Sequence, residues 1–377
     1  MSKLLLTFYG DDFTGSTDAL EQLALAGIRT LLFIQPPTPG KLRKFPGLQA
    51  IGVAGMTRAM TPNAMERELR PAFKKLKTLG ARHVHYKVCS TFDSSPGIGS
   101  IGRAIDIGAE IFPSPFVPVL AAAPSLGRYT LFGNHFARYG IGSAGSIHRL
   151  DRHPSISKHP VTPMTEADLR VHLRRQTKKR IALFDILKVA QPADKARATL
   201  KQILNEKPNV VLFDAIANEH LGRIGELLED FASAKLPLFS VGSSGIEAAL
   251  AAQWRGSRHI TQRAGPAKQL LVGSGSCSPV TFGEIDWALK NGGANGPNVK
   301  TAFYQKKDWV PTGMEGVCNP STWTDKDHRG SMKVDLYRSK VTGATDGDIN
   351  DLMAKGTIKL EKVKAVELPR KPEWFGW

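Results

Sequence analysis

The sequence has little of what several classes of protein require. Its 377 residues include only three cysteines, which lie far apart and show no C-x-x-C spacing. A disulfide framework or a zinc site is therefore not expected, and a reducing cytoplasm suits this cysteine usage. The ten histidines include no H-x-x-x-H or H-E-x-x-H pattern. We therefore expect no metal site made of protein ligands alone.

Long hydrophobic runs are also missing. No apolar stretch approaches the ~18 residues that a membrane-spanning helix needs. Near the start, Lys3 and a short apolar patch are followed at once by Asp11 and Asp12, with no small-residue cleavage site. The sequence thus predicts no signal peptide and no membrane partner, and a cytoplasmic location. With 41% hydrophobic and 23% charged residues, the chain is globular in composition and long enough for two domains.

Positive charge is abundant but dispersed. The net charge is +17, of which residues 282–377 contribute +2 and residues 1–281 contribute +15. Only short basic clusters occur, such as RRQTKKR at 174–180, and no aromatic stacking motif accompanies them. This arrangement differs from a nucleic-acid footprint, so we expect no nucleic-acid partner. Attraction of small anions explains the charge, and solubility alone explains it equally well.

Short apolar runs alternate with helical patterns over the first 250 residues. The predicted strands are 4–10, 30–35, 49–55, 81–91 and 208–215. Helical spacing of apolar residues separates them, for example over 64–80. Such alternation predicts a doubly wound α/β domain with a largely parallel sheet, whose ligands bind at the carboxyl ends of the strands.

The composition changes near Thr281. Five of the six tryptophans and only one of the ten histidines follow it, and lysine replaces arginine as the main basic residue. We therefore predict four parts, which are a substrate-binding domain over 1–250, a linker over 251–267, the start of a truncated nucleotide-binding α/β domain over 268–281, and a foreign-looking C-terminal segment over 282–377.

The loop YGDDFTGSTDAL places two adjacent carboxylates, Asp11 and Asp12, directly after the first predicted strand. The following helix begins near Gly15, and helix N-terminal amides attract anions. Vicinal carboxylates can bind a cation, hold sugar hydroxyls or act as a general base. They can equally well only cap the turn and the helix.

The loop HYKVCSTFDSSPGIGSIGRA places Lys87 at the end of another strand, with Ser90, Thr91 and Asp93 after it. An ammonium group, hydroxyls and a Gly-rich turn suit a carboxylate or a phosphate. The alternative is a solvated turn with Lys87 at the surface. Two further Gly/Ser turns, FSVGSSGIEAAL and GSGSCSPVT, each follow an apolar run. They can hold a phosphate or simply connect two elements.

Taken together, YGDDFTGSTDAL, YKVCSTFDSS, HPVTPMTEADL, VGSSGIEAAL and SGSCSPVT resemble the four-carbon acid sugar kinase family, from Met1 to about Thr281. Members phosphorylate acids such as threonate, erythronate or oxotetronates with ATP. The resemblance implies a small anionic sugar acid as substrate, with ATP and Mg²⁺ as cofactors. The implied substrate-binding residues are Asp11, Asp12, Lys87, Ser90, Thr91 and Asp93. Asp12 is the implied catalytic base, and Ser274, Ser276 and Gly245 the implied nucleotide-binding residues.

The segment 288–377 resembles the C-terminal part of periplasmic substrate-binding proteins of the branched-chain amino acid type, with T-x-x-D-H-R-G at 324–330 as its most specific element. We therefore expect an incomplete ATP domain. Three hypotheses stay open, namely a sugar-acid kinase homologue, a non-catalytic acid-sugar-binding module or inactive fusion remnant, and a solute-binding protein. The sequence identifies neither the acid nor the oligomeric state.

Overall fold

The computed structural model describes residues 4–139, 145–159, 161–254, 331–338 and 361–369. The chain separates into two compact units, Met1–Gln262 and Arg263–Phe375. Of the second unit, the structure describes one antiparallel pair of strands, β12 (Ser331–Arg338) and β13 (Glu361–Pro369). The predicted segments over 255–330 lie outside the described residues.

The first unit is built on an eight-stranded sheet in the order β2-β3-β1-β4-β11-β5-β10-β9, and every neighbouring pair is parallel. Its strands are β1 (Leu6–Gly10), β2 (Thr30–Phe33), β3 (Ala50–Ala54), β4 (His83–Lys87), β5 (Val117–Leu120), β9 (Ile181–Phe184), β10 (Val210–Phe213) and β11 (Leu238–Gly242). The large parallel sheet predicted from the alternating pattern is thus confirmed. The central strands are buried on both faces, as parallel strands covered by helices must be.

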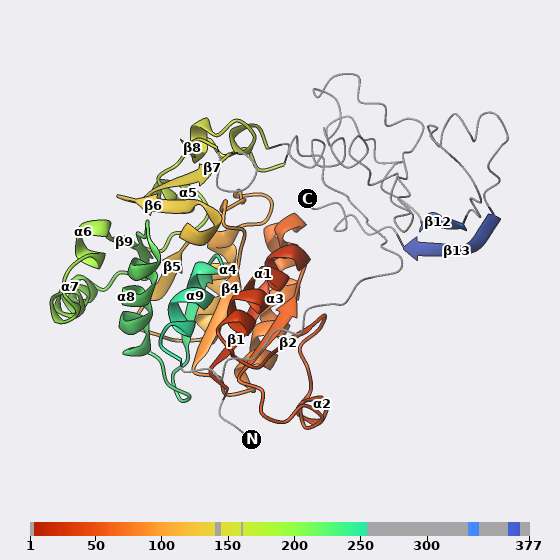
Figure 1. Ribbon diagram of the computed structural model, residues 1–377, viewed down its shortest axis with the longest axis horizontal. Coiled ribbons are helices and arrows are strands. Elements are labelled where there is room, and N and C mark those ends of the chain that lie inside the picture. Colours follow the sequence, from red (N-terminus) through yellow and green to blue (C-terminus); the bar gives the residue numbers. More distant parts are fainter. Residues whose placement is uncertain (1–3, 140–144, 160, 255–330, 339–360, 370–377) are drawn as a thin grey trace, which may run out of the picture. The chain divides into compact units, whose positions relative to one another are not determined.

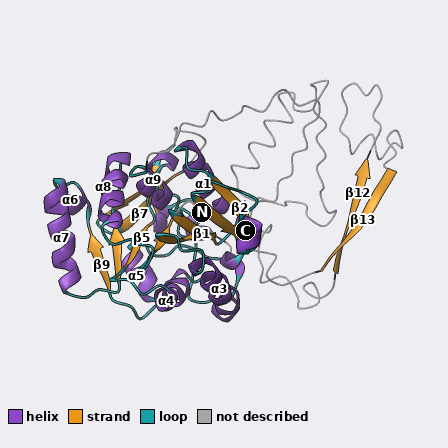
Figure 2. Cartoon of the chain, turned by 90° about the horizontal axis from the view of Figure 1, so that it is seen from below, coloured by secondary structure: helices purple, strands orange, loops and turns teal. Residues whose placement is uncertain are grey.

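Helices cover both faces of this sheet, which Figure 2 shows edge-on. They are α1 (Phe13–Leu25), α2 (Pro39–Leu42), α3 (Pro62–Lys77), α4 (Ile101–Ile111), α5 (Leu169–Arg174), α6 (Ile186–Val189), α7 (Ala193–Asn205), α8 (Asn218–Glu229) and α9 (Gly245–Ala251). One apolar core joins α3, α4 and α5 to the sheet, and a second joins α1, α7, α8 and α9 to its other face. Each amphipathic helix buries one apolar stripe, so the arrangement is doubly wound.

A small antiparallel sheet was not predicted from the sequence. It consists of β6 (Arg128–Leu131), β7 (Asn134–Arg138) and β8 (Ile147–Arg149), and Figure 1 shows it in yellow beyond one end of the main sheet. The chain reaches it directly from the carboxyl end of β5. It therefore lies at the end of the sheet where ligands of this architecture bind.

The predicted strand over 81–91 is shorter in the structure, because β4 ends at Lys87. The residues after it form local hydrogen bonds, such as that between the side chains of Thr91 and Asp93. Hydroxyl and carboxylate side chains of this kind compete with the ladder of a sheet and favour turns. The hydroxyl-rich part of the motif is therefore a loop.

Candidate functional site

The carboxyl ends of β1, β3 and β4 bring the predicted residues of both loops to one place. In the register of the sheet, Gly10 of β1 lies opposite Lys87 of β4 and opposite Ala54 of β3. The backbone N–H of Asp11 donates to the carbonyl of Lys87 over 2.8 Å. Asp11 and Lys87 therefore leave neighbouring strands at the same edge, as the strand pattern predicted.

Arg58 joins the two aspartates and was missed by the sequence analysis. It follows β3, and its Nε and Nη2 donate to the two carboxylate oxygens of Asp11 over 3.1 and 2.8 Å. Its Nη1 lies 2.8 Å from Oδ2 of Asp12. Burial raises the pKa of Asp11, and the guanidinium opposes that rise. The two carboxylates hold the pKa of Arg58 well above its usual range, against burial. Arg58 thus stays charged and fixes both side chains.

Asp12 also caps α1. Its Oδ1 accepts from the backbone N–H of Gly15 over 2.6 Å, as an N-cap side chain does. Its side chain is 25% exposed, whereas that of Asp11 is 3% exposed. Asp12 therefore does cap the helix, as the alternative interpretation of this loop predicted. The exposure singles out Asp12 as the aspartate of the pair with better access to a bound molecule.

Lys87 lies inside the protein and not at the surface, so a solvated lysine is excluded. Its side chain is 1% exposed, and its Nζ lies 3.2 Å from Oδ2 of Asp18 and 3.0 Å from the carbonyl oxygen of Val88. A Cβ atom on Gly15 would lie 3.1 Å from this Nζ and 2.5 Å from Oδ1 of Asp12. The turn before α1 and the end of β4 are therefore in close contact. Asp18, on the second turn of α1, was also missed.

The loop after β4 continues the site. The hydroxyl of Thr91 donates to Oδ2 of Asp93 over 2.8 Å and lies 2.9 Å from Sγ of Cys89. Burial raises the pKa of the Cys89 thiol to about 11, with Asp93 raising it further and Arg58 lowering it. Cys89 is thus a neutral thiol near pH 7, and both Arg58 and Asp93 are close enough to affect its pKa. Because Cys89 is close to Arg58, which binds Asp11 and Asp12, Asp93 lies in the same region of the site as these two aspartates.

Strain and a buried polar network hold this loop. Phe92 is fully buried at φ 60°, a left-handed conformation that is rare for a bulky residue and that costs about 1–3 kcal/mol. Below it, the imidazole of His172 lies 2.8 Å from the Ser94 hydroxyl and 2.9 Å from Nε2 of Gln176. Residues kept in strained conformations cluster at binding sites. The loop is therefore built to hold its polar side chains in fixed positions.

The small sheet is attached to the same loop. His135 of β7 donates through Nε2 to the carbonyl oxygen of Ser90 over 2.8 Å, and its Nδ1 accepts from the Thr130 hydroxyl over 2.8 Å. Burial lowers the pKa of His135 to about 4. This histidine is therefore neutral and has the tautomer that both bonds require. The contact of Ser90 with the small sheet is thus made by its backbone carbonyl group and not by its hydroxyl.

A fully buried carboxyl group lies beneath Lys87. Glu247 lies on the first turn of α9, and neither of its carboxylate oxygens forms a hydrogen bond with another described residue. One of them lies 3.7 Å from Nε2 of His85 on β4. Burial raises the pKa of Glu247 to about 8, and the charge of Lys87 opposes the rise. Burial, with Lys87, lowers the pKa of His85 to about 3. Both groups are neutral near pH 7. The motif VGSSGIEAAL contained this acid, but periodicity did not reveal its burial.

Of the three implied nucleotide-binding residues, the structure describes only Gly245. Gly245 begins α9 next to β11, and a Cβ atom there would lie 2.0 Å from the carbonyl oxygen of Ala122. Glycine is therefore required for close packing, and its contact with a nucleotide stays a prediction. Ser274 and Ser276 lie outside the described residues.

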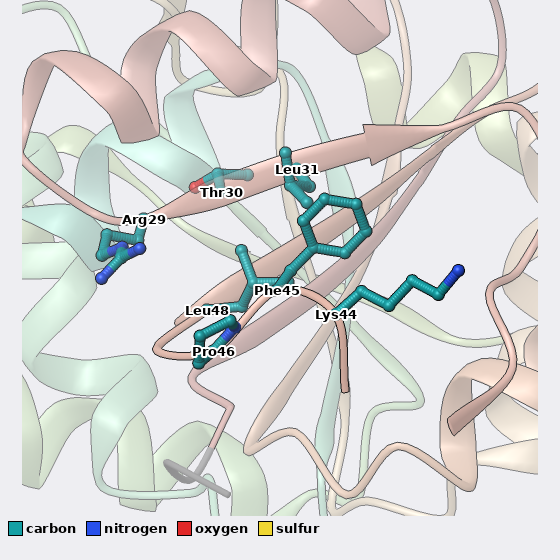
Figure 3. Close-up of a pocket in the computed structure, with 7 residues that line it drawn as sticks. All are labelled: Arg29, Thr30, Leu31, Lys44, Phe45, Pro46 and Leu48. Carbon is teal, nitrogen blue, oxygen red and sulfur yellow. The ribbon is translucent and has the colours of Figure 1, made fainter. Parts of the chain in front are cut away.

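One cavity lies away from this site. Its volume is about 640 Å³, and Figure 3 shows Arg29, Thr30, Lys44 and Phe45 among its lining residues. Arg29 and Thr30 are at the amino end of β2, the opposite end from Asp11 and Lys87. Among the described residues, no group of three or more histidine, cysteine, aspartate or glutamate side chains is arranged to hold a metal ion. The helices of the same residues include none that is long and apolar enough to cross a membrane.

Comparison with known proteins identifies the family. A model for a sugar-binding N-terminal domain matches residues 6–250. The chain is 46% identical over 295 residues to a 3-oxo-isoapionate kinase from Paraburkholderia graminis, a match that covers 77% of this chain and 61% of the relative. It is 33% identical over 291 residues to a 3-oxo-tetronate kinase from Methylobacterium radiotolerans, covering 75% and 64%. A 3-oxo-tetronate kinase from Escherichia coli is 30% identical over 278 residues, covering 73% and 67%.

Solved structures agree in fold. A protein from Salmonella typhimurium LT2 superimposes with a TM-score of 0.63 at 26% identity, covering 77% of this chain and 65% of that one. A protein from Haemophilus influenzae gives a TM-score of 0.60 at 25% identity, covering 75% and 65%. The chain spans about two thirds of the length of these relatives. The resemblance of 288–377 to periplasmic binding proteins stays a prediction. From its fold, its loops and these matches, the chain belongs to the family of the sugar-binding N-terminal domain, whose curated relatives are 3-oxo-tetronate and 3-oxo-isoapionate kinases.

Proposed function

We propose that the chain binds a small sugar acid at the carboxyl ends of β1, β3 and β4, as the substrate-binding part of an ATP-dependent kinase that phosphorylates one of the acid's hydroxyl groups. One observation carries the proposal, namely the cluster of Asp11, Asp12, Arg58 and Lys87 within the residues that the family model matches. Charged groups of both signs in a fixed arrangement suit a molecule that has a carboxylate and several hydroxyls.

Within this proposal, Asp12 takes the proton of the reacting hydroxyl. Its carboxylate is the more exposed of the two aspartates, and the bonds from Gly15 and Arg58 fix its orientation. A base that is held in place needs only a hydroxyl within hydrogen-bond reach. Asp11, Lys87, Ser90, Thr91 and Asp93 form the remainder of the proposed binding surface.

ATP, when bound, supplies the phosphoryl group, and Mg²⁺ neutralises part of its charge. The proposal assigns the nucleotide to Ser274, Ser276 and Gly245, as the family resemblance implies. The described residues contain no group of three or more acidic, histidine or cysteine ligands, so no step here is assigned to a metal held by them. The cysteine usage supports a cytoplasmic location for this activity.

A second candidate is sugar-acid binding without phosphoryl transfer. The family model favours it, because its match over 6–250 describes sugar binding alone. Calorimetry on the full-length protein separates the two candidates. Binding of threonate or erythronate together with ATP, and ATP consumption that depends on the acid, is expected for the kinase. Acid binding without ATP binding supports the second candidate, and no affinity for any four-carbon acid contradicts both.

A further inference from the structure

Among the described residues, Arg128 forms no ion pair with a carboxylate, in contrast to the other basic residues of the site. It begins β6, and its Nη1 donates to the carbonyl oxygens of Leu126, Gly127 and Arg138 over 2.8, 3.5 and 3.4 Å. Its Nε is buried and has no hydrogen-bond partner within the described part of the chain. Arg58 and Lys87, in contrast, both form ion pairs with carboxylates.

A guanidinium that is partly buried and has an unpaired N–H group raises the free energy of the folded protein. Burial lowers the pKa of Arg128, and the negative charge of Asp93 offsets this only in part. Arginine presents several N–H donors in a planar fork that matches a carboxylate, and Nε of Arg128 is one such donor without a partner among the described residues. An anionic ligand from outside the chain would satisfy it.

The pairing of the small sheet shows where Arg128 faces. Arg128 lies opposite Ala137, and Thr130 lies opposite His135. Residues two apart on a strand share a face with their cross-strand partners, so Arg128 and His135 are on one face of the sheet. His135 on that face donates to the backbone of Ser90. The face is therefore turned toward the loop after β4.

Two groups of that loop, Cys89 and Asp93, lie close enough to Arg128 to influence its pKa. The carboxylate of Asp93 raises this pKa against the effect of burial, as negative charge near a guanidinium does. The Cys89 thiol is neutral near pH 7 and marks only that the loop is close. Arg58 is close enough to Cys89 to lower the pKa of that thiol. Cys89 is thus close both to Arg58, which follows β3, and to Arg128 on the small sheet. Arg58 is already bound to Asp11 and Asp12, whereas Nε of Arg128 has no acceptor among the described residues.

We propose that Arg128 binds the carboxylate of the sugar-acid substrate, so that the small sheet selects acids over the matching neutral polyols. This inference rests on the proposed function, because it assumes that a sugar acid occupies the site. The phosphates of a nucleotide share the same chemistry as ligands of a guanidinium. The observations favour the acid, since Arg128 is turned to the loop that contains the predicted substrate residues Ser90, Thr91 and Asp93.

The test is calorimetry on the full-length protein with threonate and erythronate, the polyols threitol and erythritol, and ATP. Arg128→Gln removes the charge, Arg128→Lys keeps it without the fork, and Arg149→Gln on β8 is the matched control. Arg149 is partly exposed and pairs locally with Asp151. Losing a charge-assisted pair should weaken acid binding about tenfold or more. We expect this for Arg128→Gln, a smaller loss for Arg128→Lys, none for Arg149→Gln, and unchanged polyol and ATP affinities.

Several outcomes overturn the assignment. These are equal acid affinity in Arg128→Gln and the unchanged protein, an equal loss for acids and polyols in both Arg128 variants, or a loss confined to ATP. If Arg128→Gln does not fold, Arg128→Lys decides by the ratio of acid to polyol affinity. Failure of the unchanged protein to bind any acid is a different result, which contradicts the proposed function itself.

Discussion

The carboxyl group of Glu247 lies 3.7 Å from Nε2 of His85, and both side chains are fully buried. Neither group has another partner at these atoms within the described residues. A protonated carboxyl can donate toward a neutral imidazole nitrogen, whereas an ionised carboxylate cannot. The pair therefore favours the neutral form of both groups, and each consequence for stability has a definite sign.

The first prediction concerns alkaline pH. The pKa of Glu247 is raised from 4.5 to about 8 in the folded protein, so the unfolded chain loses its proton first as the pH rises. The contribution of Glu247 to the free energy of unfolding should therefore decrease between about pH 4.5 and 8. Below about pH 6.5 the buried histidines act in the opposite direction, so the decrease should be visible between about pH 6.5 and 8. Glu247→Gln keeps the shape and a donor, and it should be more stable than the unchanged protein at pH 8.5 by roughly 1–3 kcal/mol. Denaturant unfolding from pH 5 to 9 measures this.

Glu21→Gln on the exposed face of α1 is the control for this experiment. An exposed side chain contributes little to stability, so its profile should match that of the unchanged protein. If Glu247→Gln retains the decrease between about pH 6.5 and 8, then Glu247 is not the group that titrates.

The second prediction concerns acidic pH. Burial is the main cause that lowers the pKa of His85 to about 3 and those of His135 and His172 to about 4, from 6.5. Their stabilisation is present above pH 6.5 and is lost as the pH falls toward 4, because the unfolded chain binds protons that the folded one does not. His172→Gln should reduce the slope of unfolding free energy against pH by about one proton, or about 1.4 kcal/mol per pH unit. An unchanged slope between pH 6 and 4.5 would assign the acid sensitivity elsewhere.

The third prediction concerns Arg58. Arg58→Gln leaves the buried carboxylate of Asp11 without its bidentate partner, which should destabilise the protein by about 3–5 kcal/mol. The double variant Asp11→Asn, Arg58→Gln should recover part of this loss, because no buried charge remains. Thermal and urea unfolding measure both variants.

Arg70→Gln is the matched control for Arg58. Arg70 also has two acidic partners, Glu66 and Glu110, but its side chain is more open to solvent than that of Arg58. Solvent screens such ion pairs, so they contribute little to stability. A loss at Arg58 no larger than that at Arg70 would show that the Asp11 pair is not effectively buried.

The meeting of Asp11 with Lys87 could be predicted because it depends only on strand order and direction. Both residues directly follow apolar runs, and parallel neighbouring strands end at one edge. The same reasoning extends to Arg58, which follows the strand over 49–55. It was missed because the segment between that strand and α3 has no glycine-rich or acidic motif to draw attention to it.

Other features depend on three-dimensional packing that periodicity does not show. The small sheet arises from short runs such as RYTL and NHFAR, joined by the two-residue turn of Phe132 and Gly133 at φ 50° and 81°. Phenylalanine is an unusual residue at such a turn, so the hairpin has no sequence signature. Glu247 looks like an ordinary helix residue in the sequence, because its burial depends on the packing of α9 against α1, α8 and β11.

The last prediction concerns Gly15 at the start of α1. Alanine in a helix is more favourable than glycine by about 1 kcal/mol, but here its Cβ would lie 2.5 Å from Oδ1 of Asp12 and 3.1 Å from Nζ of Lys87. Either side chain must move, and the capping bond from Gly15 to Asp12 would weaken. Gly15→Ala should therefore change stability by no more than about 1 kcal/mol, because the lost cap and the gained propensity offset each other.

Under the proposed function, affinity for threonate or erythronate should nevertheless fall about tenfold or more in Gly15→Ala, since fixed polar groups lose their geometry. Gly222→Ala on α8 is the control, because a Cβ there meets nothing within 4 Å. It should gain up to about 1 kcal/mol of stability and keep the affinity of the unchanged protein. Calorimetry and thermal unfolding of the two variants side by side separate the effects. Unchanged acid affinity in Gly15→Ala would mean that the turn joining Asp12 to Lys87 does not position the ligand.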